Sequence, residues 1–443
     1  MLEKLLDYLN DKRILILGFG IEGKSTYKFI KKHFPNKQIM ICDQKENYEK
    51  ELENDKFAKC IHNNEYLQYL NDLDLILKTP GISFKDIDIS NFESKITSQL
   101  ELILEFTDIF TIGITGTKGK STTSSLMNSV LEKNGKKSML LGNIGIPIFE
   151  KLDEITEDTI LVLELSSHAL EYIKKSPNIA ILLNVFEEHL DHYRSYEEYI
   201  NAKYNIFKYQ KNTDYALYNI DNEVISQKKL ETSAKKVTVS MKNETSNVIL
   251  KGNKVYYNDK LVYVDDEKRH LLGKHNLNNI MFVTAVSEIL NLKSELTKVA
   301  IDEFMPLEHR MEYVGTFNGI KYYNDSIATI PQATINAIET LQDVNTLLVG
   351  GKDRGVNLNE LINYINNSNI ENIICLPKTG EYILAKIKNK NTYMVDNLEQ
   401  AVKIAKEKTK KNSICLLSPA ASSYGYFKNF EERGNIFKKL VSE

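Results

Sequence analysis

Residues 111–122, TIGITGTKGKST, carry the clearest chemical pattern in the chain. A short apolar run breaks into glycines and ends on Lys120, Ser121 and Thr122, directly before a helical pattern. Small residues let backbone N–H groups close around phosphate oxygens, a lysine adds a mobile positive charge, and the next hydroxyl reaches Mg²⁺. A strict P-loop has glycine where this chain has Ile114. We therefore predict a triphosphate-binding loop, the alternative being a plain glycine turn.

A carboxylate stands at the end of a second apolar run, in TILVLELSSHALE (159–171). Glu164 follows a strand pattern that we expect beside the strand of the phosphate loop. At the carboxyl end of such a strand it can hold Mg²⁺ directly or through water. The alternative is that Ser166 or Ser167 caps a helix and Glu164 is only solvated. The neighbouring phosphate loop favours the metal role.

The next strand pattern, IAILLNVFEEHLDHY (179–193), opens into acids, Asn184 and two histidines. His189 and His192 have the spacing of metal ligands, yet no cysteine lies near, so a zinc site is poorly supported. The helix pattern that follows, 196–210, turns Ala202, Ile206 and Phe207 inward. Lys203 lies beside them, and the pattern alone predicts a surface lysine whose stem lies on the apolar face.

A second glycine motif lies near the N-terminus, in RILILGFGIEGKS (13–25). Gly18, Gly20 and Gly23 follow a strand pattern, and Asp43 ends the next one, at the distance where an acid bonds a ribose hydroxyl. The motif suits NAD, but similar turns seat other nucleotides or only pack a strand on a helix. A third strand ends in TPGI, where Gly81 turns the backbone and a phosphate contact is expected.

Length and composition limit the possible number of domains and the possible partners. A chain of 443 residues exceeds the size of one growing core, so we expect about three domains. The net charge of −3 gives no bulk attraction to nucleic acid or to a membrane surface. Four separated cysteines without a CxxC pair favour a reducing cytosol. No stretch nears the roughly 18 apolar residues of a membrane span. We expect a cytoplasmic monomer that acts on small molecules.

The order of patterns predicts an α/β fold with three domains. We expect a Rossmann-like domain (1–92), a central P-loop domain with a parallel sheet (93–305) and a second Rossmann-like domain (306–443). Alternation at period two over 236–264 predicts a small antiparallel region within the central domain. After it, His275, Asn276 and Asn279 lead a helix. Asn276 can cap that helix while His275 and Asn279 are left for a ligand, and a cap alone and a ligand contact stay as alternatives.

Taken together, the motifs resemble those of the Mur ligase family, most closely its members that add D-glutamate. The stretches that carry the resemblance are GFGIEG, TPGI, GITGTKGKST, GNIG, ELSS, NVFEEHLDH, GKHNLNN, EHR, NDSIAT, GGKDRG and SPAASSYGYFKNFEERG. They cover the whole chain in order. The aliphatic Ile114 is shared by that family.

The resemblance implies an ATP-dependent ligase that adds D-glutamate to UDP-N-acetylmuramoyl-L-alanine in peptidoglycan precursor synthesis. The terminal carboxylate of the substrate takes the γ-phosphoryl group of ATP, and the amine of D-glutamate attacks the acyl phosphate. Phosphoryl transfer calls mainly for positioning and charge neutralisation, which lysine and Mg²⁺ supply. Two Mg²⁺ sites are implied, one of them with a carbamylated lysine at Lys203.

The resemblance also assigns residues. The catalytic residues that it implies are Lys120, Glu164, His189, Lys203 and Asn143, of which Asn143 would contact the alanyl group of the substrate. It implies as metal ligands Ser121, Glu164, His189 and Lys203. The ATP-binding residues that it implies are Gly116, Thr117, Lys118, Gly119, Lys120, Ser121, Thr122, Asn276, Asn279, Arg310 and Asp325. It implies as UDP-substrate-binding Gly18, Gly20, Ile21, Glu22, Gly23, Asp43, Gln44 and Gly81. It implies as amino-acid-binding Arg354, Ser423 and Phe430.

The sequence departs from the family at three places. Arg354 stands where lysine is more common, Ile327 replaces a frequent lysine, and Tyr424 to Tyr426 form a different local sequence. Other functions stay open: another Mur-type or a folylpolyglutamate-type amide ligase, an NAD-dependent oxidoreductase, or a nucleotide-binding regulatory module. Intact Lys120, Glu164 and His189 argue against the last.

Overall fold

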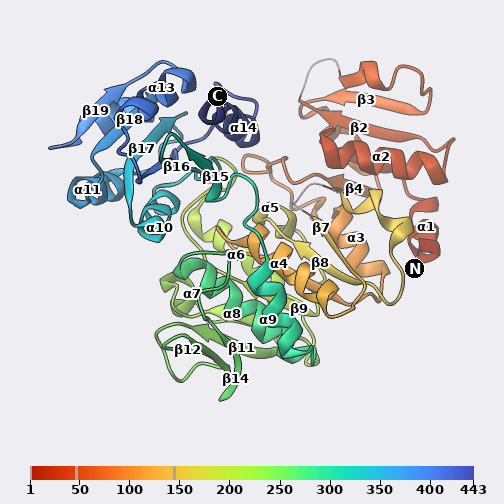
Figure 1. Cartoon of the computed structure of the whole chain (residues 1–443). Helices are drawn as coiled ribbons and strands as arrows, with labels where there is room; N and C mark the ends of the chain where they lie inside the picture. Colours follow the sequence, from red (N-terminus) through yellow and green to blue (C-terminus); the bar gives the residue numbers. More distant parts are fainter. Residues whose placement is uncertain (1, 45–47, 143–145) are drawn as a thin grey trace. The chain divides into compact units, whose positions relative to one another are not determined.

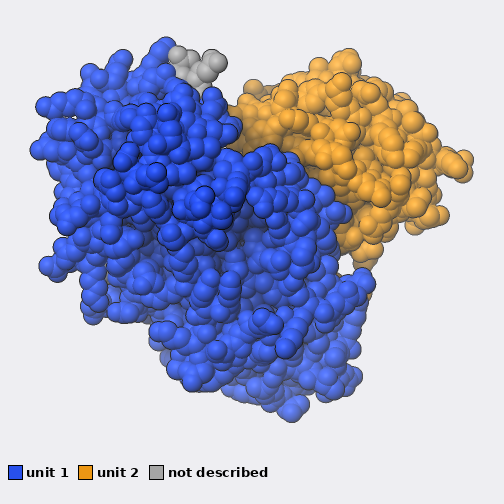
Figure 2. Space-filling model, turned by 180° about the vertical axis from the view of Figure 1, so that it is seen from behind, with its two compact units in different colours: residues 1–268, 278–302 blue, residues 269–277, 303–443 orange. Residues whose placement is uncertain are grey.

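The computed structural model describes residues 2–44, 48–142 and 146–443, which fold into helices and three sheets (Figure 1). The chain forms two compact units (Figure 2). The first comprises Met1–Lys268 and Asn278–Asp302, and the second Arg269–Leu277 and Glu303–Glu443. Two sheets belong to the first unit and one to the second. The predicted α/β class is confirmed.

The first sheet has five parallel strands in the order β3-β2-β1-β4-β5. The strands are β1 (Ile14–Leu17), β2 (Ile39–Asp43), β3 (Ala58–His62), β4 (Leu75–Lys78) and β5 (Ile96–Thr97). The order changes direction at β1, so the glycine turn after β1 lies at the switch point where open α/β sheets bind ligands. The helices of this part are α1 (Leu2–Asn10), α2 (Ile21–His33) and α3 (Gln99–Phe106). The predicted Rossmann-like opening is confirmed.

Strand β5 lies a few residues beyond the predicted domain boundary at residue 92. It pairs with β4 through Ile76 and Ile96, so the first sheet is completed only after that boundary. The three predicted domain ranges stay a prediction.

The central sheet has nine strands in the order β14-β13-β12-β11-β10-β9-β6-β8-β7. They are β6 (Thr111–Thr115), β7 (Ser138–Gly142), β8 (Ile160–Glu164), β9 (Ile179–Leu182), β10 (Tyr215–Asn219), β11 (Lys235–Ser240), β12 (Val248–Lys251), β13 (Lys254–Tyr257) and β14 (Lys260–Val264). The helices are α4 (Lys120–Lys133), α5 (Ser167–Leu170), α6 (Tyr196–Lys208), α7 (Glu223–Gln227), α8 (Lys274–Ile289) and α9 (Ser294–Glu303). Strand β6 lies between β8 and β9, and β6 and β9 are buried along their whole length. Burial on both faces explains their continuous apolar runs.

The predicted antiparallel region is confirmed for β12, β13 and β14, but not for KVTVS (236–240). That stretch belongs to β11, which runs parallel to both β10 and β12. Alternation at period two reports that one face is buried and does not report strand direction. The crossover that contains α7 returns the chain in the parallel sense.

The sheet of the second unit has the order β15-β16-β20-β17-β18-β19. Its strands are β15 (Glu312–Phe317), β16 (Ile320–Asn324), β17 (Val344–Gly351), β18 (Asn372–Lys378), β19 (Asn391–Met394) and β20 (Ile414–Leu417). Its helices are α10 (Pro331–Leu341), α11 (Asn359–Asn367), α12 (Thr379–Leu384), α13 (Leu398–Lys408) and α14 (Phe430–Ser442). Only β15 is antiparallel to its neighbour. The expected third strand–helix alternation is confirmed.

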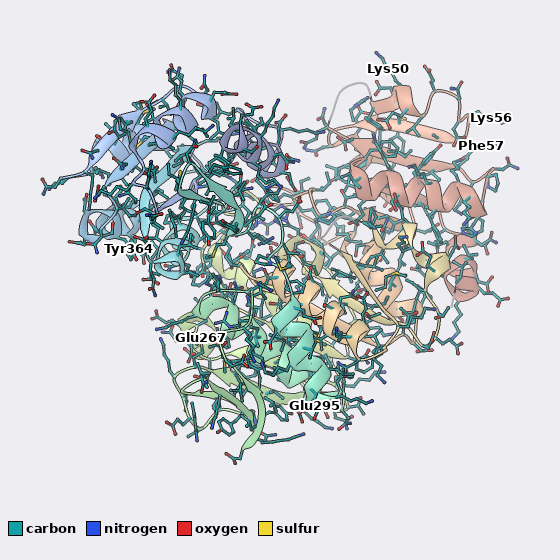
Figure 3. All side chains as sticks on the ribbon, in the orientation of Figure 1. Lys50, Lys56, Phe57, Glu267, Glu295 and Tyr364 are labelled. Atoms are coloured by element: carbon teal, nitrogen blue, oxygen red, sulfur yellow. The ribbon has the colours of Figure 1, made fainter. Side chains whose placement is uncertain are left out.

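Charged side chains cover the exterior. Lys50, Lys56, Glu267 and Glu295, labelled in Figure 3, are exposed and lie in separate parts of the chain. Within the described part of the chain, no helix combines the length and apolarity needed to cross a membrane.

Candidate active site

The phosphate loop joins β6 to α4 and takes its shape from two glycines. Gly116 and Gly119 have φ of +157° and +87°, conformations that side-chain-bearing residues rarely adopt. A Cβ atom on Gly119 would lie 2.9 Å from Oδ1 of Asn279, so that predicted ATP contact lies against the loop. The loop delivers the chain to the N-terminus of the 14-residue α4, where backbone N–H groups and the helix dipole attract phosphate.

Two lysines converge on one backbone oxygen of this loop. The ammonium of Lys120 donates to the carbonyls of Gly116 at 2.9 Å and of Thr117 at 3.1 Å. Lys203 of α6 donates to the same Gly116 carbonyl at 3.0 Å and is only 2% exposed. Burial, and then repulsion by Lys120, holds the pKa of Lys203 well below its usual value. The surface position predicted for Lys203 from the helical pattern alone is wrong.

The β9–α6 loop, residues 183–195, is fastened to the phosphate loop. Asn184 accepts the backbone N–H groups of Thr117 and Lys118 through its carbonyl and its side-chain oxygen, both within 2.9 Å. The Lys118 ammonium lies 3.2 Å from Glu188. Thr117 shares a hydrogen bond with Tyr199 of α6 at 2.8 Å. These contacts place the β9–α6 loop alongside the phosphates that the P-loop would hold.

The four proposed protein ligands of Mg²⁺, Glu164, Ser121, His189 and Lys203, come from four separate segments. Glu164 ends β8 directly beside Ile114 of β6, and Ser121 lies in the first turn of α4; both are buried. His189 lies in the β9–α6 loop with φ of +62°. Its ring is 6.0 Å from that of Tyr199, over which the Lys203 ammonium sits at 4.8 Å. His189 and Lys203 therefore flank one tyrosine.

This donor set fits Mg²⁺ shared with a nucleotide. Mg²⁺ usually keeps one or two protein ligands and takes its remaining oxygens from phosphates and water. Across residues 2–44, 48–142 and 146–443, no group of three or more His, Cys, Asp or Glu side chains is placed to hold a metal by itself. A carboxylate and a hydroxyl beside a phosphate loop agree with that mode of binding. They would not make a closed zinc site.

Three histidines pack together behind these groups. The ring of His168 lies 4.0 Å from that of His192 and 4.7 Å from that of His189. Burial lowers the pKa of His168 strongly and that of His189 as well, because desolvation disfavours the imidazolium. A neutral imidazole is the form that binds a metal. His168 and His189 are thus favoured in the form that a metal ligand needs.

The glycine turn of the first sheet is tightly packed. A Cβ on Gly18 would meet Oγ1 of Thr79 at 2.0 Å, and one on Gly23 would meet the Gly18 carbonyl at 2.0 Å. Gly20 and Gly81 face open space, and Ile21 and Gln44 are exposed beside them. Asp43 accepts the backbone N–H of Phe19 at 2.5 Å, so it orders this turn.

A cavity of about 80 Å³ lies in the first unit. Its walls include Glu22 of α2, Pro80 just after β4, Glu164 at the end of β8, and Ser166 and His168 at the start of α5. Burial raises the pKa of Glu22 to about 7, and Lys78 offsets part of that rise. The cavity connects the edge of the proposed UDP-substrate site with the proposed metal carboxylate.

In the second unit, polar side chains beyond the strand ends are linked to one another. Asp325 accepts the backbone N–H of Met311 at 3.2 Å and the hydroxyl of Ser418 at 2.8 Å. Arg433 of α14 is 1% exposed and donates to the carbonyls of Ser326 and Ala421. These bonds hold the ends of β16 and β20 and the start of α14 in one arrangement.

The predicted amino-acid site divides between buried and exposed residues. Ser423 is buried and Phe430 starts α14, where its carbonyl accepts the Ser326 hydroxyl at 2.8 Å. Arg354 is exposed in the loop after β17. Tyr424 and Tyr426 are also exposed. The unusual tyrosines therefore lie on the surface next to Ser423.

Three further residues were predicted to contact ATP or the substrate: Asn276, Arg310 and Asn143. Asn276 lies inside α8, where its side chain donates to the Leu272 carbonyl at 2.8 Å, so the capping role is wrong. Arg310 belongs to the second unit, in the turn before β15. Asn143 lies outside the described residues.

Sequence reasoning missed several residues of these sites. Lys78, His168, Glu171 and Arg433 carry buried polar contacts, yet the sequence patterns assign no role to any of them. A buried charge in an apolar strand, as at Lys78 after Leu75–Leu77, was the one available signal. A single lysine at a strand end is common on protein surfaces, so this signal alone does not predict burial.

Comparison with known families identifies two parts of the chain. Residues 114–287 match the model of the Mur ligase middle domain, and residues 309–421 match that of the Mur ligase glutamate ligase domain. Together the two ranges contain the phosphate loop and most of the second unit.

Curated relatives match almost the whole chain. Proteins named UDP-N-acetylmuramoylalanine–D-glutamate ligase are 33% identical in Clostridium kluyveri, over 98% of both chains, and 32% identical in Clostridioides difficile, over 98% of this chain and 99% of the relative. A protein of the same name from Koribacter versatilis is 31% identical, with 97% of both chains covered.

Solved structures share the fold. The UDP-N-acetylmuramate-alanine ligase MurC of Thermotoga maritima superposes with a TM-score of 0.62 at 18% identity, covering 97% of this chain and 99% of that one. MurF ligase of the same organism, in complex with ADP, gives 0.62 at 16% identity over 98% and 96%. The matched domains, the full-length relatives and the shared fold lead to one conclusion: the chain belongs to the Mur ligase family.

Proposed function

We propose that this chain is an ATP-dependent ligase that joins D-glutamate to UDP-N-acetylmuramoyl-L-alanine in peptidoglycan precursor synthesis. The observation that carries the proposal is the match to ligases of that name over 97% or more of both chains. A full-length match includes the parts that hold the nucleotide substrate, ATP and the amino acid. ADP, phosphate and an amide bond are the products.

The reaction begins with transfer of the γ-phosphoryl group to the substrate carboxylate. Lys120 and the N-terminus of α4 neutralise the phosphates, while Asn279 borders the nucleotide from α8. Glu164, Ser121 and His189 are placed to hold Mg²⁺, which supplies charge neutralisation when bound. Asn276, Arg310 and Asp325 are proposed to contact the nucleotide from the second unit.

The second step joins the amine of D-glutamate to the acyl phosphate. The nitrogen lone pair attacks the acyl carbon, the C–O bond to phosphate breaks, and the amine loses a proton. Arg354 is proposed to pair with a carboxylate of D-glutamate, with Ser423 and Phe430 beside it. Arginine presents a planar pair of donors, which suits a carboxylate well.

The UDP part of the substrate is proposed to bind at the first sheet. Gly18, Gly20 and Gly23 form the turn before α2, whose N-terminus attracts the diphosphate, and Asp43 lies beside it. Ile21, Gln44 and Gly81 complete the exposed edge. Glu22 leads from this edge into the cavity that ends at Glu164.

We also propose that Lys203 is carbamylated. Its low pKa favours the neutral amine, which adds to CO₂ and releases a proton, giving a buried carbamate whose oxygens can face Mg²⁺. Incubation with ¹³C-bicarbonate should give a carbamate carbon signal that Lys203→Met lacks. The matched variant Lys208→Met, on the same helix, should retain it. An active enzyme with an unmodified Lys203 would contradict the carbamate.

The function is tested by phosphate release. We expect release only when ATP, UDP-N-acetylmuramoyl-L-alanine and D-glutamate are all present, and loss of at least a hundredfold of the rate in Lys120→Ala. Equal release with L-lysine or D-alanyl-D-alanine in place of D-glutamate would assign the chain to another Mur ligase activity. Release in the absence of any amino acid would contradict ligation.

The remaining expectations are part of the same proposal. The three domain ranges 1–92, 93–305 and 306–443 follow the division of substrates just described. All four cysteines are free thiols, in keeping with a cytoplasmic location. Light scattering at working concentration should give the mass of a monomer, 50.9 kDa.

A further inference from the structure

A buried ionic cluster joins the first sheet to the β9–α6 loop. Lys78, the last residue of β4, lies 3.1 Å from Oε2 of Glu171, which directly follows α5. Nε2 of His192 lies 3.3 Å from the same oxygen. Side-chain exposures of 3%, 14% and 9% remove all three groups from most solvent. One carboxylate thus holds two partners from distant segments.

The same two segments are joined by further bonds. The hydroxyl of Ser83, five residues after Lys78, donates to the His192 carbonyl at 2.6 Å. Lys85 donates to the Leu190 carbonyl at 2.9 Å, and Arg194 donates to the Lys85 carbonyl at 2.7 Å. The segment after β4, which contains Gly81 of the proposed UDP-substrate site, is therefore fastened along the β9–α6 loop.

His189 lies in the middle of that loop. Its carbonyl accepts the backbone N–H groups of His192 at 3.0 Å and Tyr193 at 3.2 Å, so His189 and His192 share one tight turn. The positive φ of His189 costs free energy that the surrounding contacts must offset. On its other side, the loop is held to the phosphate loop by Asn184 and Glu188.

We propose that Glu171 is a positioning residue for the metal ligand His189. Glu171 holds the His192 end of the turn against Lys78, and thereby keeps the His189 imidazole where the phosphate loop, Glu164 and Lys203 can share a cation with it. The proposal rests on the proposed function, because it takes His189 as a ligand of Mg²⁺. In this proposal Glu171 acts through His192 and is not itself a ligand of the cation.

The burial of the cluster favours this role over simple stabilisation. A buried ion pair gives little net stability, because desolvation of the charges offsets their attraction. What such a pair provides is a fixed geometry, since an alternative arrangement would leave a charge buried without a partner. Here the geometry that is fixed is the turn that presents His189.

The test uses the full chain and Glu171→Gln, which keeps the shape of the side chain and removes its charge. Mn²⁺ binding in the presence of ADP, followed by the electron paramagnetic resonance of free Mn²⁺, should weaken about tenfold. The Mg²⁺ concentration for half-maximal phosphate release should rise by a similar factor, while KM for D-glutamate stays within twofold.

The matched control is Glu101→Gln. Glu101 is also buried, and it accepts the backbone N–H of Lys174 at 2.8 Å, away from the β9–α6 loop. It should change Mn²⁺ binding by less than twofold even if it lowers the melting temperature. Equal Mn²⁺ affinities in Glu171→Gln and Glu101→Gln would overturn the proposal.

A second variant keeps the proposal testable if Glu171→Gln does not fold. Ser83→Ala removes only the hydroxyl that donates to His192, and it should weaken Mn²⁺ binding about threefold, whereas the exposed Ser90→Ala should not. Unchanged Mn²⁺ binding in Ser83→Ala, with Glu171→Gln unfolded, would count against the proposal. Failure of the ligase assignment would differ, because the wild type would then show no release dependent on D-glutamate.

Discussion

At the scale of single residues, the site depends on charges placed where water is scarce. Lys120 and Lys203 both donate to the Gly116 carbonyl. Two positive charges this close in a site with little water would repel each other, which together with burial lowers the pKa of Lys203. Phosphate bound beside Lys120, or the proposed carbamate at Lys203, would bring negative charge to this pair. Either change would replace repulsion by attraction.

Glu22 offers a prediction at the same scale. Its pKa in the folded state is about 7, above the ordinary 4.5, so the folded chain binds this proton more tightly than the unfolded chain does. The stability contributed by that proton is present below pH 4.5 and is lost as the pH rises through 7. Glu22→Gln should therefore raise the free energy of unfolding at pH 8 by about 1–3 kcal/mol relative to wild type, with little difference at pH 4.5.

Urea denaturation at the two pH values measures this effect. Glu3→Gln, a change at an exposed position of α1, serves as the control and should leave the difference between the two pH values as in wild type. If Glu22→Gln raised the free energy of unfolding by the same amount at both pH values, the effect would come from packing and not from ionisation of Glu22.

At the scale of elements, the β9–α6 loop and α6 act together. The loop supplies His189 and ends at Ser195, whose hydroxyl accepts the backbone N–H of Glu198 at 3.2 Å and caps α6. Two turns later the same helix presents Lys203. The position of Lys203 therefore depends on where α6 begins, and hence on this cap.

Ser195→Ala should lower the free energy of unfolding by about 1 kcal/mol, since it removes a partner of an otherwise unpaired helical N–H. Ser195→Asp keeps an acceptor at the cap and should stay within a few tenths of a kcal/mol of wild type. Chemical denaturation of both variants measures the two changes in the free energy of unfolding. Equal losses in the two would show that the hydroxyl contributes by packing and not by capping.

At the scale of the whole molecule, the proposed ATP contacts are divided between the two compact units. The phosphate loop and Asn279 belong to the first, and Asn276, Arg310 and Asp325 to the second. An acyl phosphate hydrolyses in water, so the reaction requires that the site exclude water while it forms.

Mg²⁺-ADP should stabilise the protein by mass action, by about 2.7 kcal/mol at a concentration one hundred times its Kd. Lys120→Ala should lose most of that gain at the same concentration, while Lys136→Ala, an exposed lysine just beyond α4, should keep it. Denaturation with increasing ADP measures the effect. Stabilisation by NADH in place of ADP would instead support the oxidoreductase alternative.

Much of the fold and part of the candidate site can be predicted from the sequence. Strand and helix patterns predicted three α/β parts, because apolar periodicity reports burial locally. The motifs identified the phosphate loop, and Gly116 and Gly119 indeed adopt positive φ. The wrong expectations are those that depend on distant partners: the antiparallel direction of 236–240, the cap that was one alternative for Asn276, and the surface position that periodicity alone predicts for Lys203.

The sequence by itself determined where phosphate can bind and which elements surround it, since glycine geometry and apolar periodicity act within a few residues. Only the tertiary structure decided which charges are buried and with whom. Lys203 meets Gly116, 87 residues away, and Lys78 meets Glu171, 93 residues away. A pKa and an ion pair depend on those neighbours, which no local pattern reports.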